Sequence, residues 1–332
     1  MQAEVPQYGP ADVIRITNTC SVAPDTVTLS DDEVLVQNSY AGVNFIDTYF
    51  RQGLYKKPHT PFVLGDEGVG KVIKRGAAVE SPAVGQRVAY MGSVTGSYAT
   101  YTVVKAAIVS PVPDDVEDKA AVAVACQGLT AHCLTHDSYR CGPESCVLVH
   151  AAAGGTGLLI CQMAKLRGAF VVGVCGGSEK AALARSVGHV DHVVDYHAFP
   201  DWTTEVRKLV PGGFDAVYDG VGKTTFMGSL SVLRPFGFMI SFGNASGAVD
   251  PVAPLQLKDA GSVYLQRPSL FDYIRTPGEK ERRLADIWGW IKSKKLQLTY
   301  SHEFSLQEAV EAHKYLEGQK SVGKVLIRCS SP

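Results

Sequence analysis

The chain has 332 residues, of which 45% are hydrophobic and 20% charged, and its formal net charge is −1. This length allows two domains, and the near-neutral charge excludes a broad electrostatic attraction to nucleic acid or to an anionic membrane. The first ten residues lack the basic and apolar segments of a secretory signal, and no apolar run reaches the length of a membrane span. We therefore expect a cytoplasmic protein in which the eight cysteines are free thiols.

The first part of the chain predicts short strands separated by turn residues. Residues 32–40, 69–74 and 86–90 have the composition of strands, and glycines are frequent between them. A helical stretch follows from Asp115 to about Tyr139. This pattern indicates an irregular β-rich domain.

From Ser145 onward, apolar strands alternate with amphipathic helices. The expected strands are 146–150, 170–175, 192–195, 214–219, 236–242 and 262–266. Such alternation predicts a parallel sheet covered on both faces, as in a doubly wound nucleotide-binding domain. After this region we expect a helix over 279–295, a second helix that begins at the capping box Ser305–Glu308, and a final strand over 324–328. The final strand is expected to pair within the β-rich domain.

A glycine-rich turn follows the first of these apolar strands. It consists of His150-Ala151-Ala152-Ala153-Gly154-Gly155-Thr156-Gly157 and fits the dinucleotide fingerprint from Ala152 onward, with alanine in place of the first glycine. Gly154 lets the backbone approach a pyrophosphate, and Gly157 lets the helix pack close to the strand. The N-terminus of the helix offers N–H groups to the phosphates. Because the turn lies between a strand and a helix, we predict a dinucleotide site.

The end of the second apolar strand favours NADPH over NADH. NAD sites carry an acidic residue there, whereas this chain has Gly176-Gly177-Ser178-Glu179-Lys180. The glycines leave room for a 2′-phosphate, Ser178 can donate a hydrogen bond, and Lys180 can supply positive charge. Glu179 falls in the first turn of the next helix, where an exposed acid is favoured in any case. The alternative for Lys180 is an ordinary exposed helix lysine.

Several long motifs follow one another in a characteristic order. They are Gly42–Tyr49, Gly53–Tyr55, Leu64–Gly70, the alanine–glycine turn, Ser241–Asn244 and Arg267–Leu270. In these motifs the chain resembles the zinc-free quinone oxidoreductases of the medium-chain dehydrogenase/reductase superfamily, which include zeta-crystallin. The resemblance implies an α/β protein with a β-rich GroES-like domain over 1–123 and 270–332 and a Rossmann domain, with a doubly wound parallel sheet, over 124–269. It also implies a homodimer in which the strand over 262–266 pairs across the interface.

The zinc ligands of related alcohol dehydrogenases are replaced in this chain. The positions of the catalytic cysteine and histidine hold Asn44 and Asp66, and residues 91–96 stand in place of the four-cysteine loop. Too few sulfur and imidazole ligands converge for a tetrahedral zinc site, so we expect a zinc-free enzyme. Without a Lewis acid an alkoxide is hard to stabilise, whereas a quinone or an enone spreads the developing charge and needs only a modest hydrogen-bond donor.

The resemblance also implies which residues form the site. Asn44, Tyr49 and Tyr55 are the candidate catalytic residues: one tyrosine donates to the substrate oxygen, the alternative for each being core packing, and Asn44 orients the cofactor or the substrate. The expected cofactor contacts are Phe45, Ile46, Thr130, Gly154, Gly155, Thr156, Gly157, Gly176, Gly177, Ser178, Lys180, Tyr196, Phe242, Gly243, Asn244, Arg267, Ser269 and Lys324. Gly220 and Cys133 depart from some relatives, which have a serine and an aromatic residue there. His150 and His313 are expected to be packing residues.

Together these residues predict an NADPH-dependent enzyme that reduces quinones. One alternative is a reductase of 2-alkenals or enoyl thioesters, which undergo the same hydride chemistry. The other belongs to a different class, an NADPH-binding protein retained for RNA binding or as a crystallin. The near-neutral charge argues against RNA binding as the main role.

Overall fold

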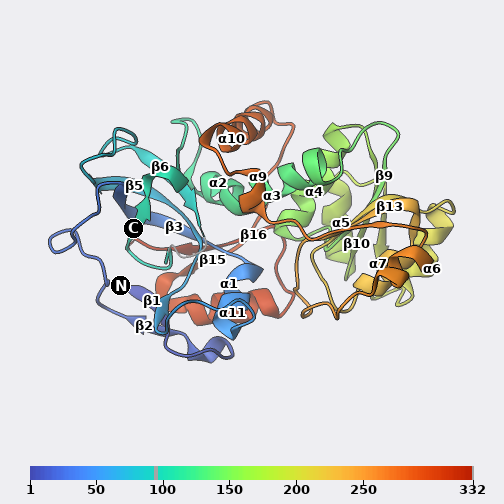
Figure 1. Cartoon of the computed structure of the whole chain (residues 1–332), viewed down its shortest axis with the longest axis horizontal. Coiled ribbons are helices and arrows are strands. Elements are labelled where there is room, and N and C mark those ends of the chain that lie inside the picture. The colour runs from blue at the N-terminus through green and yellow to red at the C-terminus, as the bar shows by residue number, and fades with distance from the viewer. Residues whose placement is uncertain (93–95, 331–332) are drawn as a thin grey trace. The chain divides into compact units, whose positions relative to one another are not determined.

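The computed structural model describes residues 1–92 and 96–330, and the chain divides into two compact units (Figure 1). The first unit comprises Met1–Cys126 and Thr299–Pro332, and the second comprises Gln127–Leu298. The first boundary lies close to the expected one. The second boundary differs, because we expected residues 270–298 in the first unit. They group with the second unit since α9 (Leu270–Tyr273) and α10 (Pro277–Lys292) pack against α3 (Leu129–Cys133).

The described part of the first unit contains two sheets. The larger has the strand order β15-β16-β3-β5-β6-β8, and β7 also pairs with β3. The strands of this sheet are β3 (Glu33–Val43), β5 (Glu67–Arg75), β6 (Arg87–Met91), β7 (Tyr101–Lys105), β8 (Val109–Pro111), β15 (Tyr300–Ser305) and β16 (Lys324–Arg328). The smaller sheet joins β1 (Gln2–Val5), β2 (Arg15–Thr17) and β4 (Phe62–Val63). As expected, the final strand pairs within the β-rich part: β16 runs antiparallel to β3, with Val325 opposite Val43.

Short helices complete the first unit. They are α1 (Phe45–Gln52), α2 (Asp118–Ala123) and α11 (Ala309–Glu317), with 3-10 turns η1 (Ala11–Val13), η2 (Ala106–Ile108) and η5 (Leu306–Glu308). The carboxylate of Glu308 accepts hydrogen bonds from the N–H and the hydroxyl of Ser305, at 2.8 and 2.7 Å. The expected capping box is therefore present, although it opens the short turn η5 that precedes α11.

The second unit is built on a parallel sheet with the order β11-β10-β9-β12-β13-β14. Its strands are β9 (Cys146–His150), β10 (Phe170–Cys175), β11 (His192–Asp195), β12 (Phe214–Asp219), β13 (Leu233–Ser241) and β14 (Tyr264–Gln266). The first four occupy the predicted residues, whereas β13 begins earlier and β14 later than predicted. Besides α3, α9 and α10, the helices are α4 (Gly155–Leu166), α5 (Ser178–Ser186), α6 (Trp202–Leu209), α7 (Phe226–Ser231) and α8 (Pro254–Asp259), and π-helical turns occupy η3 (Val124–Gly128) and η4 (Leu134–Ser138).

The central strands of this sheet are apolar because helices cover both faces. Leu148, Val172 and Val217 are fully buried and belong to one core cluster, together with Val206 of α6 and Leu230 of α7. The expected doubly wound domain is confirmed. None of the helices in the described residues is long and apolar enough to cross a membrane.

Candidate functional site

All strands of the second unit run parallel, so their last residues lie along one edge of the sheet. The chain changes direction across the sheet beside β9, which pairs with β10 on one side and β12 on the other. Open parallel sheets bind ligands outside the carboxyl ends of the strands at such a switch point. We use the name carboxyl edge for the segments that follow these strands: residues 151–157, 176–180, 196, 220, 242–244 and 267–269.

The glycine turn after β9 is packed too closely to accept side chains. A Cβ on Gly157 would lie 2.2 Å from the carbonyl oxygen of Ala151, and a Cβ on Gly155 would lie 2.1 Å from Oε1 of Gln127. Positive φ does not explain these glycines, because the one turn residue in the left-handed region is Ala151, with φ 49°. Glycine is therefore required for close approach. The turn leads into the N-terminus of α4, whose first N–H groups have no partners within the helix.

A second close contact forms after β10. The ring of Tyr196 lies over Gly176, where a Cβ would be 2.6 Å from the ring carbon Cζ. Gly177 has φ 92° and is the N-cap residue of α5, and its N–H donates to Oδ1 of Asp195 at 2.7 Å. The structure thus brings Tyr196 beside the predicted Gly176–Gly177 turn, although the two segments belong to different strands.

The end of β10 carries no acidic side chain. The strand ends at the buried Cys175, and Glu179 is exposed in the first turn of α5, as expected. Lys180 is half-buried, and burial lowers the pKa of its amine below the ordinary value. Lys180 is thus less exposed than an ordinary helix lysine, and its contact with a 2′-phosphate stays a prediction. This corner of the carboxyl edge offers one amine and the hydroxyl of Ser178.

The turn after β12 and the turn after β13 are in close contact through the backbone at Gly220 and Gly243. A Cβ on Gly243 would lie 2.3 Å from the carbonyl oxygen of Gly220, and a Cβ on Gly220 would lie 2.8 Å from the ring carbon Cζ of Phe242. The serine that some relatives have at position 220 would collide with this ring unless the ring moved. The absence of a side chain at Gly220 therefore allows the ring of Phe242 to pack against the backbone there.

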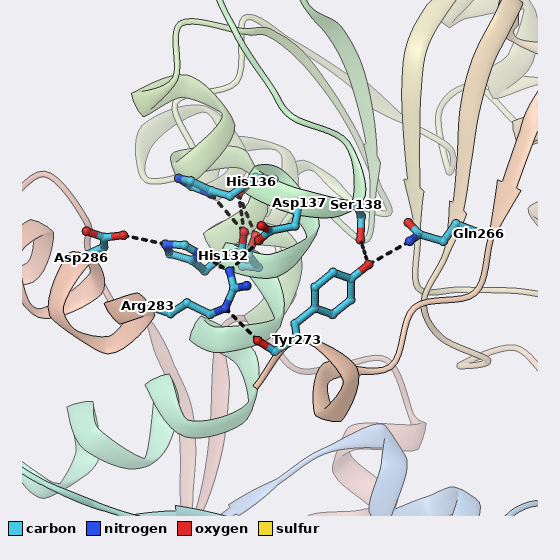
Figure 2. A network of polar contacts seen from close by, with 10 residues as sticks. His132, His136, Asp137, Ser138, Gln266, Tyr273, Arg283 and Asp286 are labelled. Atoms are coloured by element: carbon cyan, nitrogen blue, oxygen red, sulfur yellow. Dashed lines mark hydrogen bonds and ion pairs between the residues drawn. The ribbon is translucent and has the colours of Figure 1, made fainter. Parts of the chain in front are cut away.

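A polar network holds the segment after β14 (Figure 2). The hydroxyl of Tyr273 in α9 lies 2.8 Å from Oγ of Ser138 and 2.8 Å from Nε2 of Gln266, the last residue of β14. The next residue, Arg267, donates from its guanidinium to the carbonyl oxygen of Ser241 at 3.0 Å. The predicted cofactor contact Arg267 is thus held at the carboxyl edge by its own hydrogen bond to Ser241 and by the hydrogen bond of the preceding residue, Gln266, to Tyr273.

The same network attaches α10 to α3 and η4 (Figure 2). Nη1 of Arg283 donates to Oδ2 of Asp137 at 2.5 Å and lies 3.2 Å from Nδ1 of His132, and Nε2 of His132 lies 3.1 Å from Asp286. The rings of His132 and His136 stack at 4.0 Å, and burial lowers the pKa of His136 to about 4. This network explains why residues 270–298 belong to the second unit. This network leaves no local pattern in the sequence, because the partners lie far apart in the chain.

In the first unit, the side chain of Asn44 lies among buried charges at the start of α1. Its Nδ2 donates to Oε1 of Glu67 at 2.6 Å, and its Oδ1 accepts from Nζ of Lys324 at 2.9 Å. Lys324 and Glu67 also form an ion pair with each other. All three residues are buried, with relative exposures of 7%, 0% and 1% for Asn44, Glu67 and Lys324. The expected contact of Lys324 with a cofactor stays a prediction.

Further buried charges lie near these residues, and we use the name buried charge cluster for Asp47, Lys57, Asp66, Glu67 and Lys324. Burial raises the pKa of Asp47 to about 8, and that of Asp66 to about 6 despite an ion pair with Lys57 at 3.4 Å. Three acids and two bases are thus out of water, and burial favours the protonated form of Asp47. In the sequence, Asp66 stands out only as a replaced zinc ligand, and no local pattern predicts the cluster.

The two candidate tyrosines lie together. Tyr49 is buried in α1 and Tyr55 is half-buried just beyond it, and their rings meet edge to face with centroids 5.4 Å apart. The N–H of Tyr55 donates to the carbonyl oxygen of Tyr49 at 3.1 Å. Phe45 and Ile46 form the first turn of the same helix and are half-buried. The segment expected to contribute to catalysis is therefore compact, and the role of each tyrosine stays a prediction.

Comparison with known proteins agrees with this arrangement. Residues 30–114 match the alcohol dehydrogenase GroES-like domain and residues 155–286 match the zinc-binding dehydrogenase family. The chain is 38% identical over 329 residues to a probable quinone oxidoreductase of Schizosaccharomyces pombe, covering 98% of this chain and 96% of that protein. It also matches the crystal structure of Escherichia coli quinone oxidoreductase complexed with NADPH, with a TM-score of 0.93, 34% identity and coverage of 98% and 99%.

The chain belongs to the quinone oxidoreductase family. The resemblance inferred from the motifs is therefore confirmed, as is the GroES-like plus Rossmann fold. The family's neighbours include other reductases: a 2-haloacrylate reductase of a Burkholderia species is 34% identical over 305 residues, covering 89% of this chain and 90% of that protein.

The structure also bears on the predicted absence of zinc and on the two histidines expected to be packing residues. Within residues 1–92 and 96–330, no three His, Cys, Asp or Glu side chains are placed to hold a metal ion. Residues 93–95 of the stretch that we compared with the four-cysteine loop lie outside the described residues. His150 is buried against the ring of Trp202 and lies 2.9 Å from Oγ of Ser229, and His313 is buried beside Arg51.

The predicted cofactor residues fall into two groups. Most lie on the carboxyl edge of the second unit, and Thr130 lies on α3 of that unit. Phe45, Ile46 and Lys324 belong to the first unit. Their individual roles stay predictions, but the carboxyl edge gathers in one place residues from several strands that the sequence analysis named separately.

Proposed function

We propose that this quinone oxidoreductase family member binds NADPH on the carboxyl edge of its second unit and uses it to reduce quinones. The observation that carries the proposal is the pair of tight glycine contacts at Gly157 and Gly176, together with the absence of an acid at the end of β10. The first contact packs the N-terminus of α4 against the turn, which supports its N–H groups as a pyrophosphate site, and the second places Tyr196 at the corner where Lys180 is proposed to meet a 2′-phosphate.

NADPH supplies a hydride when it is bound, and the chain supplies binding and orientation. In this proposal the glycine turn and the N-terminus of α4 hold the pyrophosphate, while Ser178, Lys180 and Tyr196 hold the 2′-phosphate end. The remaining contacts are proposed for Phe45, Ile46, Thr130, Phe242, Gly243, Asn244, Arg267 and Ser269, and Lys324 is proposed to contribute through its hydrogen bond to Asn44.

The substrate chemistry is proposed for the segment that contains Asn44, Tyr49 and Tyr55. A quinone that accepts a hydride also takes up one proton, and negative charge develops on its oxygen before the proton arrives. A hydroxyl from Tyr49 or Tyr55 can stabilise that oxygen, and the amide of Asn44 can orient the reactants. Conjugation already spreads the charge, so this chemistry does not depend on a strong acid.

The test is the steady-state oxidation of NADPH, followed by absorbance, with 9,10-phenanthrenequinone as acceptor and with NADH in a parallel assay. We expect turnover with NADPH, much weaker turnover with NADH, and no effect of a chelator. Binding of NADPH without turnover of any quinone would overturn the substrate assignment. Failure to bind NADPH would overturn the assignment of the carboxyl edge.

A second candidate, reduction of an activated alkene, is favoured by the similarity to 2-haloacrylate reductase. A panel of 2-haloacrylate, 2-alkenals and enoyl thioesters assayed beside quinones separates the two, because the preferred class has the higher kcat/KM. Salt-dependent retention on RNA, with and without NADPH, tests the non-enzymatic alternative. Retention in the absence of quinone turnover would favour it.

We also propose that the protein is a cytoplasmic homodimer. β14 ends the sheet of the second unit, and its residues Tyr264 and Leu265 are 56% and 37% exposed. An exposed apolar edge strand favours pairing with another chain. The eight cysteines are free, which suits a reducing compartment. Light scattering after size exclusion tests the dimer, and a monomer at micromolar concentration would contradict it.

A further inference from the structure

The amide of Asn44 is held by two charged groups that can each interact with only one of its ends. The ammonium of Lys324 can only donate, so it must face the carbonyl oxygen Oδ1, and it does so at 2.9 Å. The carboxylate of Glu67 can only accept when it is ionised, so it must face the NH₂ group, and it does so at 2.6 Å. The Glu67–Lys324 ion pair therefore fixes which way the amide points.

The sheet of the first unit brings this pair to Asn44 from both sides. β3 ends one residue before Asn44 and has β16 on one side and β5 on the other. Val325 of β16 lies opposite Val43, so Lys324 reaches the end of β3, and Gly68 of β5 lies opposite Ala41, so Glu67 reaches the same place. The contact is thus built into the register of three strands.

Gly42 leaves the space that the pair occupies. A Cβ on Gly42 would lie 2.0 Å from Oε1 of Glu67 and 2.6 Å from Nζ of Lys324. The φ of Gly42 is not in the left-handed region, so its lack of a side chain serves this contact and no turn. Only glycine at this position allows both charged groups to reach Asn44 in the observed arrangement.

We propose that Glu67 and Lys324 are positioning residues that orient the Asn44 amide for the reaction. Burying an ion pair is costly, and breaking one by removing a single partner is costlier still, so the pair contributes little net stability. Its value is orientation, since it excludes the flipped amide. The proposal rests on the proposed function in one respect, that Asn44 meets the substrate or the cofactor. Lys324 then contributes to the cofactor site through Asn44.

The first test is a thermodynamic cycle with Glu67→Gln/Lys324→Met, which removes both charges together, and Asn44→Ala. A glutamine can donate or accept, so the double variant no longer dictates the amide orientation. We expect kcat with NADPH and quinone to fall about 10-fold to 100-fold, as for small misplacements of a reacting group, with the KM for NADPH changed by less than about threefold. In the Asn44→Ala background the same two substitutions should leave kcat almost unchanged, because the effects of substitutions at residues that act as a unit are not additive.

Two further variants guard against a loss of folding. Gly42→Ala keeps both charges and displaces them from Asn44, and it should reproduce the fall in kcat. Arg87→Gln/Asp118→Asn removes another ion pair of the first unit, at 3.0 Å, from the opposite end of the β5–β6 pair, and should leave kcat unchanged. Additive losses in the cycle, or an equal loss in the control, would overturn the positioning role.

A readout without turnover keeps this proposal separate from the proposed function. In protein labelled with ¹⁵N-asparagine, the two side-chain amide protons of Asn44 are assigned by their disappearance in Asn44→Ala. We expect them to exchange slowly with solvent in the parent protein and much faster in the double variant and in Gly42→Ala, with NADPH present throughout. Unchanged exchange would overturn the proposal even if the parent reduces quinones. Changed exchange in a parent that reduces no quinone would support it and overturn only the substrate assignment.

Discussion

The carboxyl edge of the second unit and the buried charge cluster of the first unit fix their groups by opposite means. The carboxyl edge is built from backbone: glycines bring chain segments to within contact, and strand and helix ends present N–H groups. The cluster is built from side chains, with Asn44 held between a carboxylate and an ammonium out of water. A backbone site fails when a Cβ is added, whereas a side-chain site fails when a charge or a hydrogen-bonding end is changed.

The largest expected effect tests the backbone site. In Gly157→Val, the new side chain collides with the carbonyl of Ala151, which lies 2.2 Å from the Cβ position. We expect NADPH affinity to fall by at least about 100-fold, equivalent to roughly 2.8 kcal/mol, because α4 can no longer pack against the turn and its N-terminus is displaced from the pyrophosphate site. Isothermal titration calorimetry measures this. Gly142→Ala, where a Cβ meets nothing within 4 Å, is the matched control. Equal affinities in the two variants would show that NADPH binds elsewhere.

Removing the hydroxyl of Tyr49 or of Tyr55 should have the next largest effect, on kcat. We expect kcat with quinone to fall roughly 30-fold in one of Tyr49→Phe and Tyr55→Phe and little in the other, since a hydrogen bond to a charged oxygen contributes about 1.5–3 kcal/mol. The rings of Tyr49 and Tyr55 pack edge to face, with centroids 5.4 Å apart. Circular dichroism and the KM for NADPH test whether either substitution disturbs this packing. Small, equal changes in both variants would assign the two tyrosines to packing.

A substitution at the corner of the carboxyl edge should change cofactor preference. Lys180→Ala is expected to weaken NADPH binding about 10-fold, or 1.4 kcal/mol, and to leave NADH binding unchanged, because only NADPH carries the 2′-phosphate. Lys208→Ala, which alters an exposed lysine paired with Glu205 in α6, serves as the control. If both cofactors weaken equally, Lys180 supports the helix and does not read the phosphate.

The smallest expected effect is a pH dependence of stability that arises from the buried charge cluster. The pKa of Asp47 rises from its ordinary 3.8 to about 8 in the folded chain, through burial and then through the neighbouring Asp66 and Glu67, opposed by Lys324. Between these values the folded chain keeps a proton that the unfolded chain has lost. The contribution of Asp47 to the free energy of unfolding therefore falls as pH rises toward 8, by about 1 kcal/mol per pH unit.

Buried or half-buried histidines act in the opposite direction in the window from pH 6 to pH 8, because the pKa values of His132, His136, His150 and His313 are lowered in the folded chain and their unfolded forms titrate near 6.5. The difference in stability between the parent and Asp47→Asn isolates the contribution of Asp47. Urea unfolding at pH 6, 7 and 8 measures this difference. Asp47→Asn should remove the contribution of Asp47, so its stability relative to the parent should increase with pH, whereas the difference between Asp32→Asn, at an exposed position, and the parent should stay constant. A difference between Asp47→Asn and the parent that stays constant from pH 6 to pH 8 would mean that Asp47 is ionised at neutral pH.

Much of the second unit could be predicted because its signals are local. Four strands fall on the predicted residues, since a strand buried on both faces must be apolar along its whole length. The glycine turn was equally readable, because the requirement for glycine at Gly157 comes from Ala151, only a few residues away. At β13 and β14, where the strand pattern in the sequence is weaker, the observed bounds differ from the predicted ones.

The sequence by itself therefore determined the alternation of strands and helices, the glycine turn and the absence of an acid at the end of β10. Only the tertiary structure decided that α9 and α10 belong to the second unit, since Arg283 meets Asp137 across 146 residues of chain. It also decided that Glu67 and Lys324 meet at Asn44, across 23 and 280 residues. Local steric and hydrophobic requirements leave a pattern in neighbouring residues, whereas a buried ion pair is set by the register of strands that are distant in the chain.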